Sequence, residues 1–284
     1  MTYYQLGLIG YPVSHSLSPK IQNAALKACG LDGEYSLFPI APDDMQALKE
    51  LLHRVRSGEI TGLNVTTPHK QNVIPMLDEI TSTAKTIGAV NVIYMRDNKL
   101  VGDNTDASGF LSDLKKSLAT EPQSHRDSNA LVLGAGGSAR AVVYALLNDG
   151  WDVKLFARRL EQAKQLANSF PNYQLQITDN ILNIELSNIS LIVNTTPVGM
   201  TPNIDQSPLP EDIVVSKDMF VYDLVYNPRE TKLVRDARAQ GLQAATGLGM
   251  LIEQAALAFQ LWTGHPAPRE SMHTAVAQSP ASDL

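Results

Sequence analysis

The sequence predicts an α/β fold in two domains, an N-terminal α/β domain with a mixed sheet and a doubly wound domain with a parallel sheet. Short apolar runs alternate with helical periodicity along most of the chain. The 284 residues, 44% hydrophobic and 18% charged, have ordinary globular composition and suffice for two modest domains. From 129 to 245 the alternation is regular, which indicates a right-handed parallel sheet covered on both faces.

The first third should begin with an apolar strand at 5–10 and a helix at 19–28. Ser18 and Pro19 favour a helix start there, because a hydroxyl caps the helix and proline suits its first position. The elements expected next are a strand at 34–39, a helix at 43–55, strands at 62–66, 88–94 and 99–102, and helices at 82–86 and 107–118. Asp97 and Asn98 should form the turn of a hairpin.

The second half should contain six parallel strands, at 130–133, 152–157, 173–177, 190–194, 219–223 and 242–245. A polar segment at 120–128 reads as a surface connection. A long apolar helix is expected at 247–262, bounded by Gly264, with a short terminal helix and loose final residues after it.

A glycine turn follows the strand at 130–133 and precedes a helix. Its residues are Gly134, Ala135, Gly136, Gly137 and Ser138. Bare backbone at a helix N-terminus lets a pyrophosphate approach the N–H groups, where the helix dipole favours its charge. The third glycine of the usual fingerprint is absent, and the alternative is an ordinary tight turn. The flanking pattern favours a Rossmann-like dinucleotide-binding domain.

The end of the next strand indicates which nicotinamide cofactor is preferred. An acidic residue there would suit a free 2′-hydroxyl, whereas a basic one suits a 2′-phosphate. Arg158 and Arg159 occupy this position, and no acid lies between Val153 and Leu160. A guanidinium grips phosphate through parallel hydrogen bonds. The sequence therefore favours NADP over NAD, the alternative being two solvated surface arginines.

Polar residues gather at the expected strand ends of the first third. They are Ser14 and Ser16, Thr66 and Lys70, Asn91, and Asn104 to Asp106. Strand ends of open α/β sheets converge on one crevice. These hydroxyls, amides, one ammonium and one carboxylate suit a small polyhydroxylated acid. Taken singly, the serines and Thr66 read as turn residues, Lys70 as a surface lysine, and Thr105 or Asp106 as a helix N-cap.

Composition excludes several classes of protein. The net charge of −6 implies no broad cationic face for nucleic acid. Cys29 is the single cysteine, which excludes an internal disulfide framework and suits a reducing compartment. No apolar run has membrane-spanning length, and the N-terminus lacks signal-peptide features, so we expect a cytoplasmic protein without a membrane partner. The spacing of His15 and His69 does not favour a metal site.

Taken together, the motifs resemble those of the shikimate dehydrogenases, over most of the chain from Gly7 to Gly264. The segments that carry the resemblance are GYPVSHSLSPKIQN (10–23), NVTTPHK (64–70), GAVN (88–91), GDNTD (102–106), the glycine turn at 134–138, NTTPVGM (194–200), YDLVYNP (222–228) and GLGMLIEQA (247–255). Gln22, Val92 and Ala157 depart from residues that are common in the family.

The resemblance implies NADP-linked reduction of 3-dehydroshikimate to shikimate, in aromatic amino acid biosynthesis. It implies a substrate-binding and catalytic domain at 1–106, completed by helices at 247–284, a dinucleotide-binding domain at 107–246, and an active site between them. Lys70 and Asp106 match the catalytic pair. The matches to substrate contacts are Ser14, Ser16, Thr66, Asn91, Asp106, Tyr226 and Gln254. The matches to cofactor contacts are residues 134–138, Arg158, Leu224 and Gly247, with Thr196 near the nicotinamide and Arg159 beside Arg158.

A secondary alcohol loses a hydride from carbon and a proton from oxygen, and the nicotinamide takes the hydride. Our hypothesis is that Lys70 exchanges the proton while Asp106 orients it, although Asp106 could share that role. The alternatives are a quinate or dual quinate/shikimate dehydrogenase that accepts NAD, a folate-linked dehydrogenase of related build, and a nucleotide-responsive regulator. The expected partner is a small-molecule substrate, and the expected state is a monomer or a homodimer.

Overall fold

The computed structural model describes residues 2–119, 128–181, 184–210 and 218–277. The chain divides into two compact units, the first made of Met1–Gly109 with Ile252–Asp283 and the second of Phe110–Leu251. Over the described ranges, no helix is long and apolar enough to cross a membrane. The predicted surface connection at 120–128 and the final residues lie almost entirely outside these ranges.

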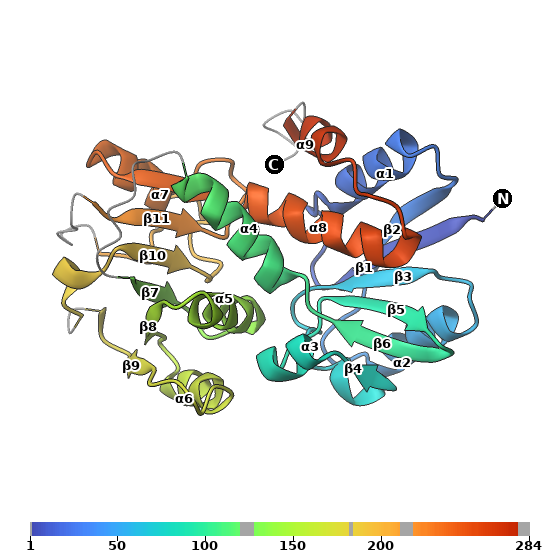
Figure 1. The fold of residues 1–284 in the computed structure, drawn as a ribbon, viewed down its shortest axis with the longest axis horizontal. Helices are drawn as coiled ribbons and strands as arrows, with labels where there is room; N and C mark the ends of the chain where they lie inside the picture. Colours follow the sequence, from blue (N-terminus) through green and yellow to red (C-terminus); the bar gives the residue numbers. More distant parts are fainter. Residues whose placement is uncertain (1, 120–127, 182–183, 211–217, 278–284) are drawn as a thin grey trace. The chain divides into compact units, whose positions relative to one another are not determined.

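The first unit contains a six-stranded mixed sheet in the order β2-β1-β3-β5-β6-β4 (Figure 1). Its strands are β1 (Tyr4–Gly10), β2 (Gly33–Pro39), β3 (Gly62–Val65), β4 (Glu79–Ile80), β5 (Val92–Arg96) and β6 (Lys99–Asp103). β1 runs parallel to both β2 and β3, whereas β5 runs antiparallel to β3 and β6. The mixed sheet confirms the predicted fold class.

Two local predictions in this unit were wrong. The strand expected at 88–94 begins only at Val92, because Gly88 ends the preceding helix in the left-handed region at φ 70°. Ser18 does not cap its helix: the N-cap is Leu17, and Ser16 Oγ accepts from the Ser18 N–H at 3.2 Å. The hairpin turn is confirmed, since β5 and β6 pair on either side of two residues with φ of 52° and 59°, as a type I′ turn requires.

The helices of this unit are α1 (Ser18–Ala28), α2 (Met45–Arg56), α3 (Ser82–Ile87) and α9 (Arg269–Ala277). Two further helices continue into the second unit, α4 (Asp106–Leu118) and α8 (Leu248–Thr263).

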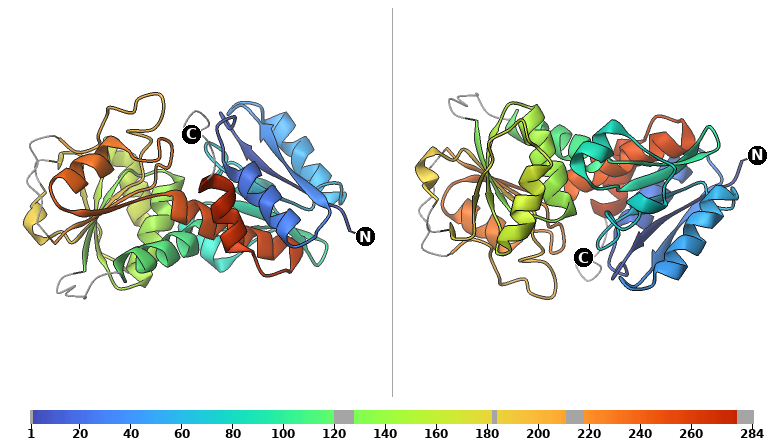
Figure 2. Two further views of the ribbon diagram at one scale, coloured as in Figure 1. Left: turned by 90° about the horizontal axis from the view of Figure 1, so that it is seen from above. Right: turned by 90° about the horizontal axis from the view of Figure 1, so that it is seen from below.

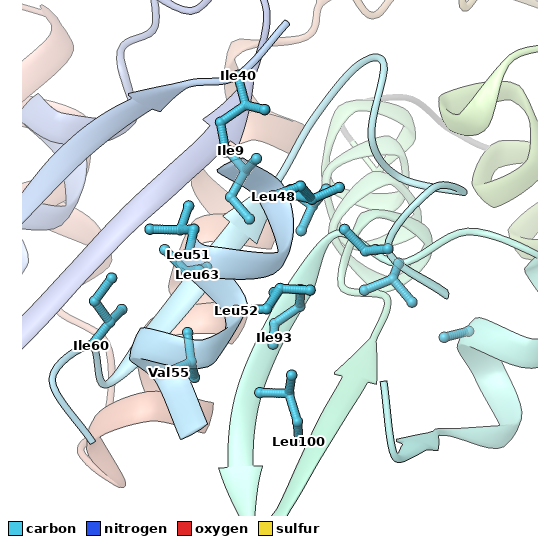
Figure 3. Close-up of a cluster of buried hydrophobic side chains, with 14 residues drawn as sticks. Ile9, Ile40, Leu48, Leu51, Leu52, Val55, Ile60, Leu63, Ile93 and Leu100 are labelled. Atoms are coloured by element: carbon cyan, nitrogen blue, oxygen red, sulfur yellow. The ribbon is translucent and has the colours of Figure 1, made fainter. Parts of the chain in front are cut away.

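One buried cluster fixes α2 on the sheet (Figure 3). Leu48, Leu51, Leu52 and Val55 follow the i, i+3, i+4, i+7 spacing of a single helix face, and all four are buried. They pack in one cluster with strand residues that include Ile9, Leu63 and Ile93. Each fully buried leucine contributes about 2 kcal/mol of transfer free energy, so this face holds α2 in place.

The second unit contains a six-stranded sheet in the order β12-β11-β10-β7-β8-β9. The strands are β7 (Asn129–Leu133), β8 (Asp152–Phe156), β9 (Gln176–Thr178), β10 (Leu191–Asn194), β11 (Phe220–Asp223) and β12 (Gln243–Thr246). Every pair is parallel, as predicted. Helices that include α5 (Gly137–Asn148), α6 (Leu160–Asn168) and α7 (Lys232–Ala239) cover both faces (Figure 2).

Candidate functional site

The carboxyl ends of β1 and β3 bring two polar loops together in the first unit. Thr66 N–H donates to Ile9 O at 2.8 Å, and Tyr11 N–H donates to Thr67 O at 3.0 Å. Gly10 allows this approach, because a Cβ at that position would lie 2.3 Å from Thr66 Cγ2. The loops at 10–16 and 66–70 therefore share one edge of the sheet.

Lys70 and Asp106 form a buried ion pair. Lys70 Nζ donates to Asp106 Oδ2 at 2.6 Å, and the two side chains are 11% and 7% exposed. The pair joins residues 36 positions apart, Lys70 after β3 and Asp106 at the start of α4. An ammonium that little water reaches, held by an oriented carboxylate, suits proton exchange with a bound oxygen atom.

Asn91 holds the carboxylate from the other side. Its Nδ2 donates to Asp106 Oδ1 at 2.8 Å, and its Oδ1 accepts from Thr105 N–H at 2.7 Å. Its own backbone is fixed, because its N–H donates to Asp103 O and its carbonyl accepts from Val65 N–H. Both oxygens of Asp106 are thus engaged, and the carboxylate cannot rotate without losing a hydrogen bond.

Asn104 caps α4. Its Oδ1 accepts from the N–H groups of Asp106 at 3.0 Å and Ala107 at 3.3 Å, while its Nδ2 donates to Ala89 O. The sequence leaves Thr105 and Asp106 as possible N-caps, and the side chain that bonds the first N–H groups of α4 is that of Asn104. Asp106 lies in the first turn, where the helix dipole stabilises a negative charge.

Gln254 reaches the same cluster from α8. Asn91 Nδ2 lies 3.5 Å from Gln254 Oε1. The approach of α8 depends on Gly109 of α4, because a Cβ there would lie 2.7 Å from Gln254 N and 2.8 Å from its Cβ. Four of the predicted residues, Lys70, Asn91, Asp106 and Gln254, therefore meet in one hydrogen-bonded cluster.

The remaining predicted substrate residues lie in loops that follow strands. Ser14 is exposed and Ser16 is half-buried in the loop after β1, and half-buried Thr66 begins the loop after β3. The oxygen of Ser16 accepts a backbone hydrogen bond at the start of α1. Tyr226 belongs to the second unit.

His69, beside Lys70, is fully buried and anchors its loop. Its Nε2 lies 2.7 Å from Ile40 O, to which it donates, and its Nδ1 has no hydrogen-bond partner in the described part of the chain. Across those same ranges, no group of three or more His, Cys, Asp or Glu side chains could hold a metal ion.

In the second unit, the glycine turn lies between β7 and α5. Gly134 has φ +112°, a region that L side chains rarely adopt, and a Cβ there would lie 2.6 Å from Thr195 Oγ1. Gly136 is the N-cap of α5, makes no side-chain cap, and has open space around its Cβ position. Bare backbone at the N-terminus of this 12-residue helix fits a pyrophosphate.

Arg158 and Arg159 follow β8, the strand beside β7, and both are exposed. Neither forms an ion pair with any residue that the structure describes. Two guanidinium groups without a carboxylate partner fit a 2′-phosphate at this position.

Asp223 is a buried carboxylate to which the sequence assigned no role. It ends β11, and burial raises the pKa of its carboxyl to about 6, although hydrogen bonds from Thr231, Val225 and Asn194 lower it. Thr105 belongs to the predicted polar cluster, and its specific role there is to bond Asn91. Spacing cannot reveal either role, since each depends on partners that the fold brings together.

Family models match three stretches of the chain. They are described as the shikimate dehydrogenase substrate binding domain at 8–93, shikimate / quinate 5-dehydrogenase at 116–234, and the shikimate 5′-dehydrogenase C-terminal domain at 247–277. The chain is also 40% identical over 280 residues to the shikimate dehydrogenase (NADP(+)) of Methanopyrus kandleri, covering 96% of this chain and 94% of that one.

Solved structures are similar over nearly the whole chain. Shikimate 5-dehydrogenase from Thermus thermophilus in complex with NADP(H) and shikimate is 37% identical, with TM-score 0.84, covering 99% of this chain and all of that one. Quinate dehydrogenase from Corynebacterium glutamicum in complex with NAD is 30% identical, with TM-score 0.86, covering 98% of this chain and all of that one.

Proposed function

The chain belongs to the shikimate dehydrogenase family, and we propose that Lys70 and Asp106 handle the proton in its NADP-dependent interconversion of 3-dehydroshikimate and shikimate. The single observation that carries this assignment is the buried 2.6 Å contact between Lys70 Nζ and Asp106 Oδ2, with Asn91 on the second carboxylate oxygen.

NADP, when bound, supplies or accepts the hydride. Different residues of the chain would bind the pyrophosphate, the 2′-phosphate and the nicotinamide half of this cofactor. The turn at 134–138 would receive the pyrophosphate, and Arg158 with Arg159 would receive the 2′-phosphate. Thr196, Leu224 and Gly247 would line the nicotinamide half.

The substrate would be held by side chains suited to its groups. Ser14 and Ser16 would donate to the carboxylate, since two hydroxyls at a loop can both point toward one acid group. Thr66, Asn91, Asp106, Tyr226 and Gln254 would bond the ring hydroxyls and the carbonyl. Amides and carboxylates distinguish a hydroxyl from a hydrogen atom, because an unmatched buried polar group costs free energy.

Lys70 would give a proton to the carbonyl oxygen during reduction and recover it from the alcohol during oxidation. Asp106 would accept hydrogen bonds from both the ammonium and the substrate hydroxyl, and so align the oxygen and nitrogen atoms between which the proton moves. Asn91 would keep Asp106 from rotating, since it holds the oxygen that Lys70 does not. Proton transfer over a fixed short distance avoids the entropic cost of assembling the groups.

Steady-state kinetics with two acids and two cofactors tests the substrate and the cofactor of this reaction, and the Lys70 variant described in the Discussion tests the proton path. We expect kcat/KM to be highest with shikimate and NADP. The alternative is a quinate dehydrogenase that accepts NAD, for which the similarity to the Corynebacterium glutamicum enzyme is the supporting observation. A higher kcat/KM with quinate than with shikimate would replace the substrate assignment. A higher kcat/KM with NAD than with NADP would replace the cofactor assignment.

A further inference from the structure

Asp223 makes three hydrogen bonds to uncharged groups. Its Oδ1 accepts from Asn194 Nδ2 at 2.8 Å and from Val225 N–H at 3.0 Å, and its Oδ2 accepts from Thr231 Oγ1 at 2.7 Å. The side chain is fully buried. A carboxylate inside a protein is costly unless its acceptor sites are filled, and here three hydrogen bonds fill them.

The carboxylate fixes the orientation of the Asn194 amide. Because an ionised carboxylate only accepts, the NH₂ group of Asn194 has to face it. The Asn194 oxygen then faces the other way and accepts from Thr196 N–H at 3.0 Å and Thr196 Oγ1 at 2.7 Å. Asp223 thereby determines the conformation of the turn at 194–196, which it does not itself touch beyond Asn194.

This turn packs directly on the glycine turn. Thr195 Oγ1 donates to Leu133 O at 2.6 Å. A Cβ on Gly134 would lie 2.6 Å from Thr195 Oγ1 and 3.0 Å from Thr196 Cγ2. A shift of the turn at 194–196 would therefore reach the backbone that precedes the N-terminus of α5.

Asp223 also orders the segment after β11. Its Oδ1 accepts from Val225 N–H, two residues further along the chain, and Leu224 N–H donates to Asn194 O at 2.9 Å. Gly247 packs against this segment, since a Cβ on it would lie 2.0 Å from Leu224 O. Asp223 thus ties together two segments at the carboxyl ends of β10 and β11.

The strand order shows which half of a dinucleotide these segments would serve. In the sheet, β8 lies on one side of β7, and β10 and β11 lie on the other. A dinucleotide with its pyrophosphate at the β7 turn and its adenosine ribose at Arg158 after β8 has to extend its nicotinamide half over β10 and β11.

We propose that Asp223 is a positioning residue for the nicotinamide half of NADP, acting through Asn194 on the turn at 194–196 and through Val225 on the segment after β11. The inference rests on the proposed function, because it takes NADP as the ligand. Asp223 is fully buried, and its effect passes through the backbone of these two segments.

Calorimetric titration of the Asp223→Asn variant with two ligands tests the positioning role of Asp223. NADP carries the nicotinamide half, and adenosine 2′,5′-bisphosphate lacks it. Asparagine keeps the shape but loses one acceptor site and the charge. We expect affinity for NADP to fall by about tenfold or more, the loss of roughly one charge-assisted hydrogen bond, while affinity for the bisphosphate changes less than about twofold.

Thr231→Val is the matched control. It removes the third hydrogen bond of Asp223 on the α7 side, where Thr231 also caps the helix, and leaves the bonds to Asn194 and Val225 intact. We expect it to lower thermal stability without changing the ratio of the two affinities. Equal losses for both ligands in Asp223→Asn, or no loss for either, would overturn the positioning role.

Asn194→Ala removes the hydrogen bond between Asn194 and Asp223 by deleting the donor, and it replaces Asp223→Asn if that variant does not fold. Failure of both to fold would assign the network to folding and overturn the inference. The proposed function fails separately, if the unsubstituted protein binds NADP no more tightly than NAD.

Discussion

Lys70 Nζ lies 2.6 Å from Asp106 Oδ2, and neither side chain is more than 11% exposed. Removing either partner leaves an uncompensated charge that little water reaches, which is destabilising as well as inactivating. Tests of this pair therefore have to separate a lost proton path from a loosened fold, and stability and cofactor binding have to be measured beside turnover.

Lys70→Met should lower kcat by about 100-fold or more, the scale of one general acid–base group, because methionine fills similar space and carries no proton. NADP affinity should stay within about twofold, since the proposed nucleotide contacts belong to the second unit. Lys99→Met is the control, because Lys99 is 59% exposed in a surface ion pair. A Lys70→Met enzyme within about tenfold of the original kcat would remove Lys70 from the proton path.

Gly109→Ala should lower both stability and kcat. The added Cβ would lie 2.7 Å from Gln254 N, so α4 and α8 have to separate. Overpacking of this kind costs about 1–3 kcal/mol, and Asp106 and Gln254 would shift with their helices. Chemical denaturation and steady-state kinetics measure the two effects. Ser108→Ala, at an exposed neighbouring position, should change neither stability nor kcat. Unchanged stability and kcat in Gly109→Ala would show that the close approach of α4 and α8 is not needed.

Strands and long helices were predictable from the sequence, because their apolar periodicity is local. The regular alternation after 129 gave the parallel sheet with nearly the observed strand positions. β4 was missed, since Glu79 and Ile80 form only two residues of strand and carry no pattern. The strand expected at 173–177 starts at Gln176, and nothing in its composition marks that start.

The candidate site was predictable in part, for a related reason. Polar residues after strands indicate a shared edge, and Lys70, Asn91 and Asp106 do meet. Contacts set by the fold were not predictable. Asp223 takes its partners from positions 29 residues before it and 8 after it, and no local pattern distinguishes such an aspartate from one at any strand end. The ligand contacts of every predicted site residue stay predictions.

The raised pKa of Asp223 predicts a pH-dependent stability. In the folded protein this carboxyl is protonated below about pH 6, whereas in the unfolded chain it is protonated only below about 3.8. The folded state therefore binds more protons between these values, and stability from this group falls as pH rises through them. The difference between the two pKa values corresponds to about 3 kcal/mol.

Denaturant unfolding of the unsubstituted protein and of Asp223→Asn at pH 4.5 and pH 7 measures this effect. Relative to the variant, the unsubstituted protein should lose about 2 kcal/mol of unfolding free energy between the two pH values, since most of the linkage falls in that interval. The difference between the proteins cancels every other titrating group. A constant difference would show that burial does not hold Asp223 protonated at low pH.

Arg158→Ala combined with Arg159→Ala should change cofactor preference rather than activity as such. Both guanidinium groups follow β8 and lack a carboxylate partner among the described residues, so a 2′-phosphate would be the group that they bind. Charge-assisted hydrogen bonds of this kind contribute about 1.5–3 kcal/mol, which corresponds to a loss of about 10- to 100-fold in kcat/KM with NADP. NAD has no 2′-phosphate, so kcat/KM with NAD should stay nearly constant and serves as the internal control. Parallel losses with both cofactors would mean that the arginines support the fold of this strand end instead of selecting NADP.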